Sequence, residues 1–408
     1  MSNNNTLLII GLVWPEPGSS AAGTRMIQLI NLFVSNNFNV VFASVAQPSD
    51  HSVDMASIGA TQHTIELNSD SFDIFIREQN PNFVVFDRFV IEEQFGWRVS
   101  THCPHAIKIL DTEDLHCIRI ARQLALKAGV ACDNTFIAAQ DVAKREIASI
   151  YRCDLSLIIS MYEMALLKSL FKIDSTLLMY LPLFYESLKV ELPSFASRLG
   201  FMFIGNFHHE PNRDAVVYLK EILWPLIRAK TAADIYIYGA YMPNHIITYN
   251  NPSQGFHILG RAESSAKVLR QARVMLAPLH FGAGLKGKLL EAMQNGTASV
   301  TTQVGAEGIA SADDWNGAIE DDPARFAASA VNLYHDEVAW NKAQQNGYKI
   351  LESRFRSEDF IKGFLQRLSE LQETLRQHRQ NNFIGSMLQY HTMRSTEFMS
   401  RWIEAKNK

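Results

Sequence analysis

The stretch VMLAPLHFGAGLKGKLLEAM, residues 274–293, places Gly282, Gly284 and Gly287 between an apolar run and an amphipathic run. The apolar run is typical of a buried strand and the amphipathic run of a helix, so the glycines stand in a turn before a helix N-terminus. Free backbone N–H groups at such a terminus attract an anion, whichever anion it is. The stretch therefore predicts an anion site, and the charged residues beside the glycines indicate its ligand.

A dinucleotide is one candidate for that anion. A Rossmann dinucleotide site needs an acidic residue about 20 positions later, at the end of the next strand. Here the next strand, TASVTT over residues 297–302, ends without a carboxylate, and the first acidic residue beyond it is Glu307. The loop after the first strand, WPEPGSSAAG, does not fit the fingerprint either. A nucleotide-dependent oxidoreductase is therefore kept only as an alternative.

A nucleoside diphosphate fits the charges better. Lys286 and Lys288 stand at the start of the helix, and Glu291 follows Lys288 by one turn. Two ammonium groups beside free N–H groups suit a diphosphate, and a carboxylate one turn deeper can accept hydrogen bonds from vicinal hydroxyls. The competing interpretation is a solvated helix that carries one Lys–Glu pair at i,i+3.

The composition narrows the class of protein. A chain of 408 residues with 47% hydrophobic and 20% charged residues favours two globular domains. A formal net charge of −4 gives no electrostatic case for nucleic acid as a partner. The four cysteines lack C-x-x-C spacing, and the N-terminus lacks the basic flank of a signal peptide, so we expect a cytoplasmic protein.

Short apolar runs alternate with amphipathic stretches along most of the chain, which predicts parallel sheets with helices on both faces. The alternation breaks near residue 190 and then restarts. We therefore expect an α/β protein with two Rossmann-like, doubly wound domains, over residues 1–190 and 191–360, followed by helices over 361–408. Ligands of open α/β sheets bind at the carboxyl ends of the strands, so we expect the two domains to face a cleft.

Several segments resemble glycosyltransferases with the GT-B fold, in the large family-four group (glycosyl transferases group 1). The segment APLHFGAGLKGKLLEAMQNGTASVTTQVGAEGI resembles the donor-binding segment of that family, and FIGNFHHEPNRDAVVYLKEILWP the opening of its second domain. DTEDLHCIR and LIISMYEMALL match weaker first-domain signals. The similarity spans most of residues 7–360 and is most specific over 277–309.

The resemblance implies an enzyme that moves a sugar from a nucleoside diphosphate sugar to an acceptor hydroxyl, with retention of anomeric configuration. The nucleotide sugar is then a co-substrate, and neither a cofactor nor a metal is expected. The acceptor would be a glycan or a lipid-linked molecule, in bacterial surface polysaccharide or glycoconjugate synthesis.

The resemblance also assigns roles to the opening stretch. Lys288 would contact the donor phosphates and act in catalysis, and Glu291 would bind the ribose. Gly282 and Gly284 would let the backbone approach the donor, with Lys286 as a helper.

One position departs from the family pattern. Many relatives carry a glutamate eight residues before Glu291, where this chain has Ala283. That departure leaves the sugar undefined and motivates a second alternative, a nucleotide-sugar-binding protein of the same fold without catalysis.

Four further residues complete the expected donor site. Gly23 and Arg25 begin the helix after the first strand, where N–H groups would face the phosphates across the cleft. Gly260 ends the strand FHILG and Arg261 follows it, and either Arg213 or Arg261 would supply positive charge.

In the first domain, His116 follows a strand end and is the second expected catalytic residue. Helix capping by Asp111 or Asp114 is the competing role for that segment. For His208 and His209 we expect a surface turn before a helix.

The tail over residues 381–408 repeats apolar residues at near-helical spacing beside basic ones. We expect it to pack against the first domain. A peripheral contact with the inner face of a membrane is the alternative, although Glu397 and Glu404 dilute the basic face that such a helix needs.

Overall fold

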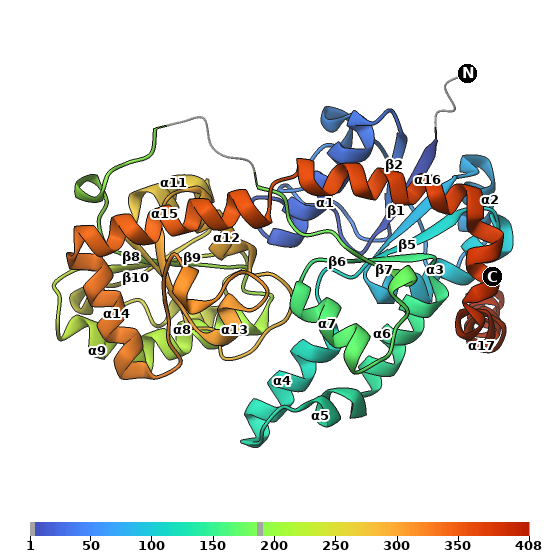
Figure 1. Ribbon diagram of the computed structural model, residues 1–408. Helices are drawn as coiled ribbons and strands as arrows, with labels where there is room; N and C mark the ends of the chain where they lie inside the picture. Colours follow the sequence, from blue (N-terminus) through green and yellow to red (C-terminus); the bar gives the residue numbers. More distant parts are fainter. Residues whose placement is uncertain (1–4, 186–190, 408) are drawn as a thin grey trace.

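The computed structural model describes residues 5–185 and 191–407. Two α/β bodies lie side by side, each built on one parallel sheet (Figure 1). The predicted fold class, two Rossmann-like domains, is confirmed. The boundary expected near residue 190 falls at residues 186–190, outside the described part of the chain.

The first sheet has seven parallel strands in the order β3-β2-β1-β4-β5-β6-β7. The strands are β1 Thr6–Gly11, β2 Asn39–Ser44, β3 Thr61–Thr64, β4 Phe83–Asp87, β5 Ile107–Asp111, β6 Leu155–Ile158 and β7 Leu178–Tyr180. The helices are α1 Ala21–Ser35, α2 Ser71–Gln79, α3 Phe89–His102, α4 His116–Ala128, α5 Asn134–Ala139, α6 Asp141–Arg152 and α7 Met161–Ser169. Successive residues of β1 enter opposite cores, Leu8 on one face and Leu7 on the other, because side chains alternate along a strand.

The second sheet has six parallel strands in the order β10-β9-β8-β11-β12-β13. The strands are β8 Phe201–Ile204, β9 Ile235–Tyr238, β10 Phe256–Gly260, β11 Val274–Ala277, β12 Ala298–Thr301 and β13 Gly317–Ile319. The helices are α8 Glu210–Tyr218, α9 Trp224–Arg228, α10 Asn244–Ile247, α11 Ser265–Gln271, α12 Gly287–Gln294, α13 Gln303–Ala306, α14 Pro323–His335 and α15 Glu337–Arg354. In both sheets the strand order reverses beside the first strand, between β1 and β4 and between β8 and β11. These reversals are the switch points at which open α/β sheets bind ligands.

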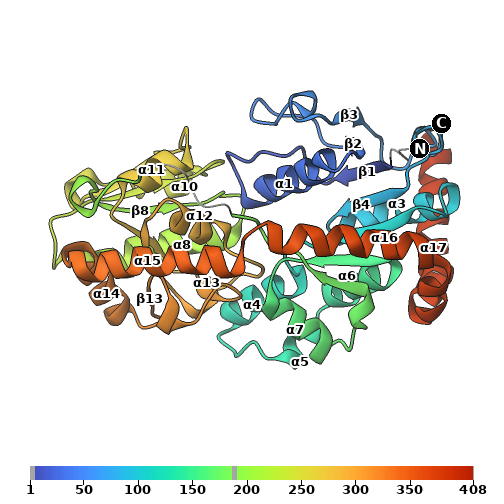
Figure 2. The same ribbon diagram turned by 45° about the horizontal axis from the view of Figure 1, so that its top comes forward.

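The chain crosses between the domains twice. After α15 it returns to the first domain as α16 Glu358–Asn381, which runs along that domain in Figure 2. Phe364, Leu368 and Leu371 of α16 are at most 2% exposed and belong to a core cluster of the first domain. The Tyr185 N–H, on the first crossing, donates to the Phe355 carbonyl on the second at 2.9 Å. The two crossings therefore lie side by side.

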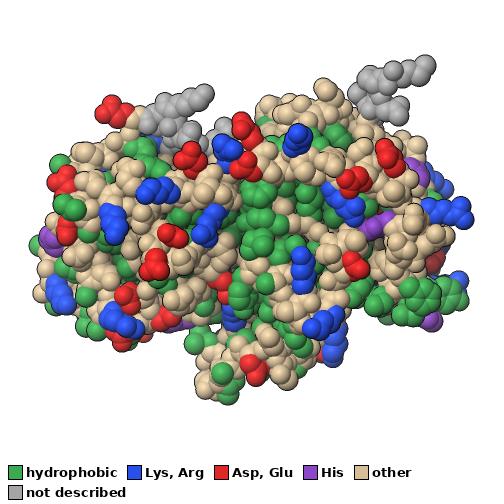
Figure 3. Space-filling model, viewed as in Figure 1, with side chains coloured by type: hydrophobic (Ala, Val, Ile, Leu, Met, Phe, Trp, Pro, Cys, Tyr) green, Lys and Arg blue, Asp and Glu red, His purple; other side chains and the backbone are tan. Residues whose placement is uncertain are grey.

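The last helix, α17 Phe383–Asn407, packs against α3 and α6 of the first domain. Ser400 is 4% exposed on that side, and Arg98 of α3 ion-pairs with Glu404 at 3.3 Å. Large apolar side chains remain on the outer side of α17, where they gather at the right of Figure 3: Phe383, Ile384, Met387, Tyr390, Phe398, Met399 and Trp402. Among the described residues, no helix is long and apolar enough to cross a membrane.

Candidate active site

A cleft of about 870 Å³ lies between the two domains. Its walls are the loops that follow β1, β4 and β5 in the first domain and β8 and β11 in the second. The cleft therefore lies beside the switch points of both sheets. Seven of the predicted site residues line it, namely Gly23, His116, Arg261, Gly282, Lys286, Lys288 and Glu291.

The glycine-rich loop over residues 281–286 of the second domain is held by residues of the first domain. Gly284 has φ 62°, and a Cβ there would lie 2.9 Å from the Asp114 Cβ of the first domain, so only glycine fits. The Gly284 N–H donates to Glu163 Oε1 at 2.8 Å, and Arg122 donates to the Gly282 carbonyl at 2.7 Å. Gly284 therefore packs against the first domain and does not line the cleft, whereas Gly282 lines it.

Lys288 is a cation without an anionic partner. Its Nζ donates to Asn212 Oδ1 at 2.6 Å and lies 4.3 Å from the centre of the Phe203 ring. Within the described part of the chain, no carboxylate ion-pairs with it. Burial lowers the pKa of Lys288 to about 7, because the ammonium form loses solvation that the Asn212 hydrogen bond and the Phe203 ring do not fully replace. An anion bound in the cleft beside Lys288 would stabilise its ammonium form.

Glu291 lies one turn further along α12 and also lines the cleft. Its carboxylate accepts a hydrogen bond from the Ser265 hydroxyl, and burial raises its pKa. The half-buried Glu291 carboxyl can therefore accept hydrogen bonds from the hydroxyl groups of a ligand that also contacts Lys288.

Lys286 is more enclosed than Lys288. It is 7% exposed, and its Nζ donates to the Gly284 carbonyl at 3.0 Å. Burial lowers its pKa to about 8, whereas the nearby Glu307 carboxylate opposes that change. Lys286 therefore shapes the glycine loop as well as lining the cleft.

His116 begins α4 and faces the second domain across the cleft. Its Nε2 lies 3.4 Å from Asp114 Oδ1, and the Phe89 ring packs edge-on against the imidazole. Burial lowers the pKa of His116 to about 4, so the ring is neutral at pH 7. Asp114 stays ionised despite burial, since Arg119 lowers its pKa.

Arg25 requires a correction, because the structure places it away from the cleft. It is 1% exposed, and its guanidinium donates to Asp111 at 2.7 Å and to the Leu181 carbonyl at 2.8 Å. Asp111 neutralises this buried arginine and caps no helix. The ion pair ties α1 to β5 and leaves no role for Arg25 at a phosphate.

Two glycines are corrected for different reasons. The Gly23 N–H donates to the Ser20 hydroxyl, which caps α1, so it is not available to a donor phosphate. A Cβ at Gly23 would lie 2.4 Å from the Glu16 backbone, which explains the glycine by packing. Gly260 does not line the cleft, and its carbonyl accepts from the Gly239 N–H at 2.7 Å.

Arg261 lies at the mouth of the cleft, where the two domains touch. Its Nη1 donates to the Ser19 hydroxyl at 2.7 Å. Beside it, the Tyr241 hydroxyl donates to the Glu16 carboxylate at 2.8 Å. The loop after β1 is therefore linked to the second domain above the donor residues.

Several cleft residues were missed from the sequence. Arg88 directly follows β4 and Glu113 lies two residues after β5, so their position near strand ends was the available signal. Asn212 accepts a hydrogen bond from Lys288, and Ser265 donates one to Glu291. No sequence signal pointed to either residue. His209 also lines the cleft, at the N-terminus of α8, where only a surface turn was expected.

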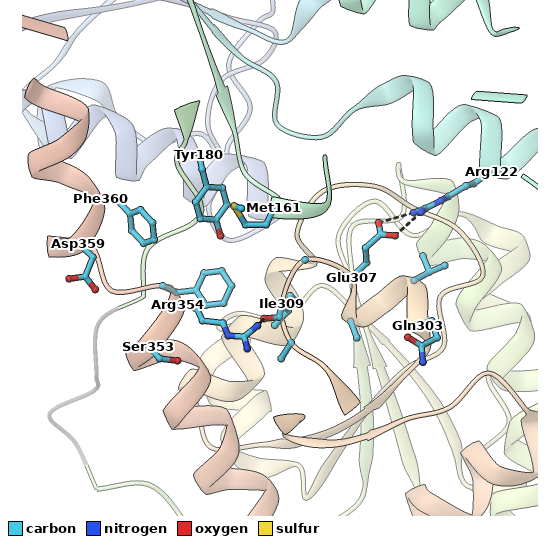
Figure 4. A pocket seen from close by; sticks show the side chains of 15 residues that line it. Arg122, Met161, Tyr180, Gln303, Glu307, Ile309, Ser353, Arg354, Asp359 and Phe360 are labelled. Carbon is cyan, nitrogen blue, oxygen red and sulfur yellow. Dashed lines mark hydrogen bonds and ion pairs between the residues drawn. The ribbon is translucent and has the colours of Figure 1, made fainter. Parts of the chain in front are cut away.

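A second pocket of about 760 Å³ lies at the junction of the domains and contains none of the predicted residues (Figure 4). Arg122 of α4 and Glu307 of the second domain form a bidentate ion pair at its edge, with distances of 2.9 and 2.7 Å. This pair joins the domains beside the glycine loop. Among the described residues, no group of three or more His, Cys, Asp or Glu side chains is arranged to hold a metal ion.

Two doubly wound domains that face a cleft, with a glycine loop before α12, define the GT-B class of fold. Residues 198–336, most of the second domain, match the family of glycosyl transferases group 1. The resemblance inferred from the sequence, to group 1 glycosyltransferases with the GT-B fold, is confirmed. A comparison with curated proteins gives no match.

Solved structures extend the likeness to both domains. Sucrose-phosphate synthase from Thermosynechococcus elongatus is 14% identical with a TM-score of 0.68, over 90% of this chain and 99% of that one. HepE from Anabaena, in complex with UDP and glucose, is 11% identical with a TM-score of 0.64, over 90% and 100%. The pneumococcal O-GlcNAc transferase GtfA, in complex with UDP and GlcNAc, is 12% identical with a TM-score of 0.64, over 90% and 99%.

Proposed function

We propose that this protein is a glycosyltransferase that transfers a sugar from a nucleoside diphosphate sugar to an acceptor hydroxyl. The observation that carries the proposal is Lys288, a cation in the cleft with no carboxylate partner among the described residues, one turn before Glu291. A diphosphate supplies the missing anion, and ribose hydroxyls suit the carboxyl beyond it.

The reaction puts its main electrostatic demand on the same residue. As the acceptor oxygen bonds to the anomeric carbon, the bond from that carbon to the phosphate oxygen breaks, and the acceptor hydroxyl passes its proton to the departing phosphate oxygen. Negative charge grows on the departing diphosphate. We assign the stabilisation of that charge to Lys288 and the N-terminal end of α12, because preorganised donors have this role in other enzymes.

The finer assignment rests on resemblance. We propose retention of anomeric configuration, a glycan or lipid-linked acceptor, and a role in bacterial surface polysaccharide or glycoconjugate synthesis at the cytoplasmic side of the membrane. Neither a metal nor a cofactor is required by this scheme, since basic side chains and a helix N-terminus carry the leaving-group charge.

A thermal-shift screen against UDP, GDP, ADP and their sugar conjugates tests the proposal. UDP is the first choice, because the HepE and GtfA structures are UDP complexes. We expect one nucleoside diphosphate to stabilise the protein and its sugar conjugate to be consumed. Stabilisation by NAD alone would favour an oxidoreductase. Binding without hydrolysis or transfer, across saccharide acceptors, would favour the alternative suggested by Ala283, a protein that binds the nucleotide sugar without turnover.

A further inference from the structure

Glu113 is the most unusual carboxyl in the cleft. It follows β5, lines the cleft and is 8% exposed. Its backbone has φ 60°, in the left-handed region that a glutamate rarely adopts. Such a conformation costs on the order of 1–3 kcal/mol and persists only where surrounding structure enforces it. The fold therefore holds this carboxyl in place at an energetic cost.

The Glu113 carboxyl has no partner of its own. Within residues 5–185 and 191–407, no side chain or backbone group hydrogen-bonds or ion-pairs with it. Its neighbour Asp87 shares this condition in part, since Asp87 Oδ1 is buried without a hydrogen-bond partner. The Glu113 oxygens, in contrast, are not among the fully buried atoms, so they reach the surface of the cleft that Glu113 lines. A carboxyl that faces a ligand cleft without a protein partner is free to bind a hydroxyl of the ligand.

The position of Glu113 relates it to the proposed donor. The next residue, Asp114, packs against Gly284, where an added Cβ would lie 2.9 Å from the Asp114 Cβ. The turn at 113–114 therefore adjoins the glycine loop that leads to Lys288. A sugar attached to a diphosphate at Lys288 would lie next to this turn. On the facing wall, Ala283 offers no hydrogen bond from its side chain.

We propose that Glu113 is a sugar-binding residue, which holds a hydroxyl of the transferred sugar. This inference rests on the proposed function and deepens it, because it assigns the part of the donor that Lys288 and Glu291 do not reach.

The charge state of Glu113 suits that task. Burial raises its pKa to about 8, the Asp111 and Asp87 carboxylates act in the same direction, and Arg88 and Arg25 oppose them. At pH 7 the group is therefore mostly a neutral acid, which can both donate to and accept from one hydroxyl. Ionisation above pH 8 would remove the donor.

Three variants separate this role from a structural one. Glu113→Gln keeps a neutral group that donates and accepts, Glu113→Ala removes it, and Glu113→Gly removes it while relieving the backbone strain. Asp141→Asn, at a carboxylate that is 91% exposed on α6, is the matched control. Calorimetry gives the affinity for UDP, GDP and ADP and for the glucose or mannose conjugate of each.

We expect all variants to bind the free diphosphate as the parent does. For the sugar conjugate, Glu113→Ala and Glu113→Gly should lose about tenfold in affinity, whereas Glu113→Gln should stay within about twofold. The parent's preference for the conjugate over the free diphosphate should decline above pH 8, and that of Glu113→Gln should not.

Equal affinities for the conjugate in the parent and in both Glu113→Ala and Glu113→Gly would overturn the inference and leave the proposed function intact. Loss in Glu113→Gln equal to that in Glu113→Ala would overturn the neutral-acid role. Absence of binding by every diphosphate and conjugate would overturn the proposed function, and this inference with it.

Discussion

At the scale of single residues, the cleft places groups where they are poorly solvated until a ligand arrives. Lys288 has the Asn212 amide oxygen and the Phe203 ring as neighbours, and among the described residues no carboxylate ion-pairs with it. Such a residue weakens the ligand-free fold and strengthens anion binding at the same time. The two effects can be measured separately.

Replacing the charge should stabilise the empty protein. The pKa of Lys288 is about 7 in the fold and about 10.4 in an unfolded chain. Between these values the unfolded chain binds more protons, so stability rises with pH, and below pH 7 the full cost of the buried charge is present. Lys288→Met should therefore melt at a higher temperature than the parent at pH 6.5, with a smaller difference at pH 9.5. A lower melting temperature at pH 6.5 would contradict the burial cost.

The same residue should govern turnover. Lys288→Ala should lower kcat by an amount on the order of 2–4 kcal/mol in transition-state stabilisation, comparable to removal of one oxyanion donor. Glu291→Gln should chiefly raise KM for the donor, because a ribose contact is the same in the ground state and the transition state. Steady-state kinetics on a confirmed donor distinguish the two. Kinetics of Lys288→Ala that match the parent would remove the diphosphate assignment.

At the scale of elements, the ion pair between Arg122 and Glu307 fastens α4 to the second domain. Both side chains are 14% exposed, and Arg122 also holds the Gly282 carbonyl. A double-mutant cycle with Arg122→Ala and Glu307→Ala should give a coupling energy of about 1–3 kcal/mol. The exposed pair of Arg145 and Glu93 within the first domain is the control, with ~0.2–1 kcal/mol expected. Equal coupling energies in both cycles would show that the interdomain pair contributes no more stability than an exposed pair.

The last helix gives a second prediction at this scale. Deletion of residues 383–408 should lower the melting temperature, because α17 packs against α3 and α6 and its Ser400 and Glu404 contact the buried Arg98. Trp402→Ser is the control, since Trp402 is 60% exposed and its loss should leave stability unchanged. Flotation with anionic and neutral vesicles tests the membrane alternative for the same outer face. Unchanged melting after the deletion, with lost vesicle binding, would favour the membrane role.

The elements also show what sequence patterns can reveal. The buried strands β1, β2, β4, β5 and β6 are short apolar runs, which is the pattern from which the parallel sheet was predicted. The strand β3 was missed, since TQHT is polar and exposed at the sheet edge, and β7 is only three residues long. The role of Arg25 could not be predicted from the sequence, because its partner Asp111 is distant along the chain. The role of Gly23 could not be predicted either, because it depends on how the loop at Glu16 packs. Spacing places Lys288 and Glu291 on one helix, whereas it says nothing of Asn212 or Ser265.

At the scale of the whole molecule, the cleft needs both domains at once. The proposed donor residues belong to the second domain, and His116 and Glu113 to the first. The mouth contacts, from Tyr241 to Glu16 and from Arg261 to Ser19, join the two domains in this structure and should help to hold the cleft closed over a donor.

Small-angle scattering should show a smaller radius of gyration with a tightly bound nucleotide sugar than without it. The variant Tyr241→Phe, which removes the hydroxyl that donates to Glu16, should weaken this compaction and leave the affinity for the free diphosphate nearly unchanged. Superimposable curves for the parent with and without ligand would count against a closing cleft.

The return of α16 to the first domain has a consequence for synthesis of the chain on the ribosome. The first domain's sheet ends at Tyr180, yet its core is filled by Phe364, Leu368 and Leu371. Roughly 190 residues separate those segments, which at about 5–20 residues per second delays completion of that core by about 10–40 s. Throughout that interval the nascent first domain exposes the apolar surface that α16 later covers. Chaperones that bind such surfaces would therefore meet this protein during translation, before its second domain has left the ribosome.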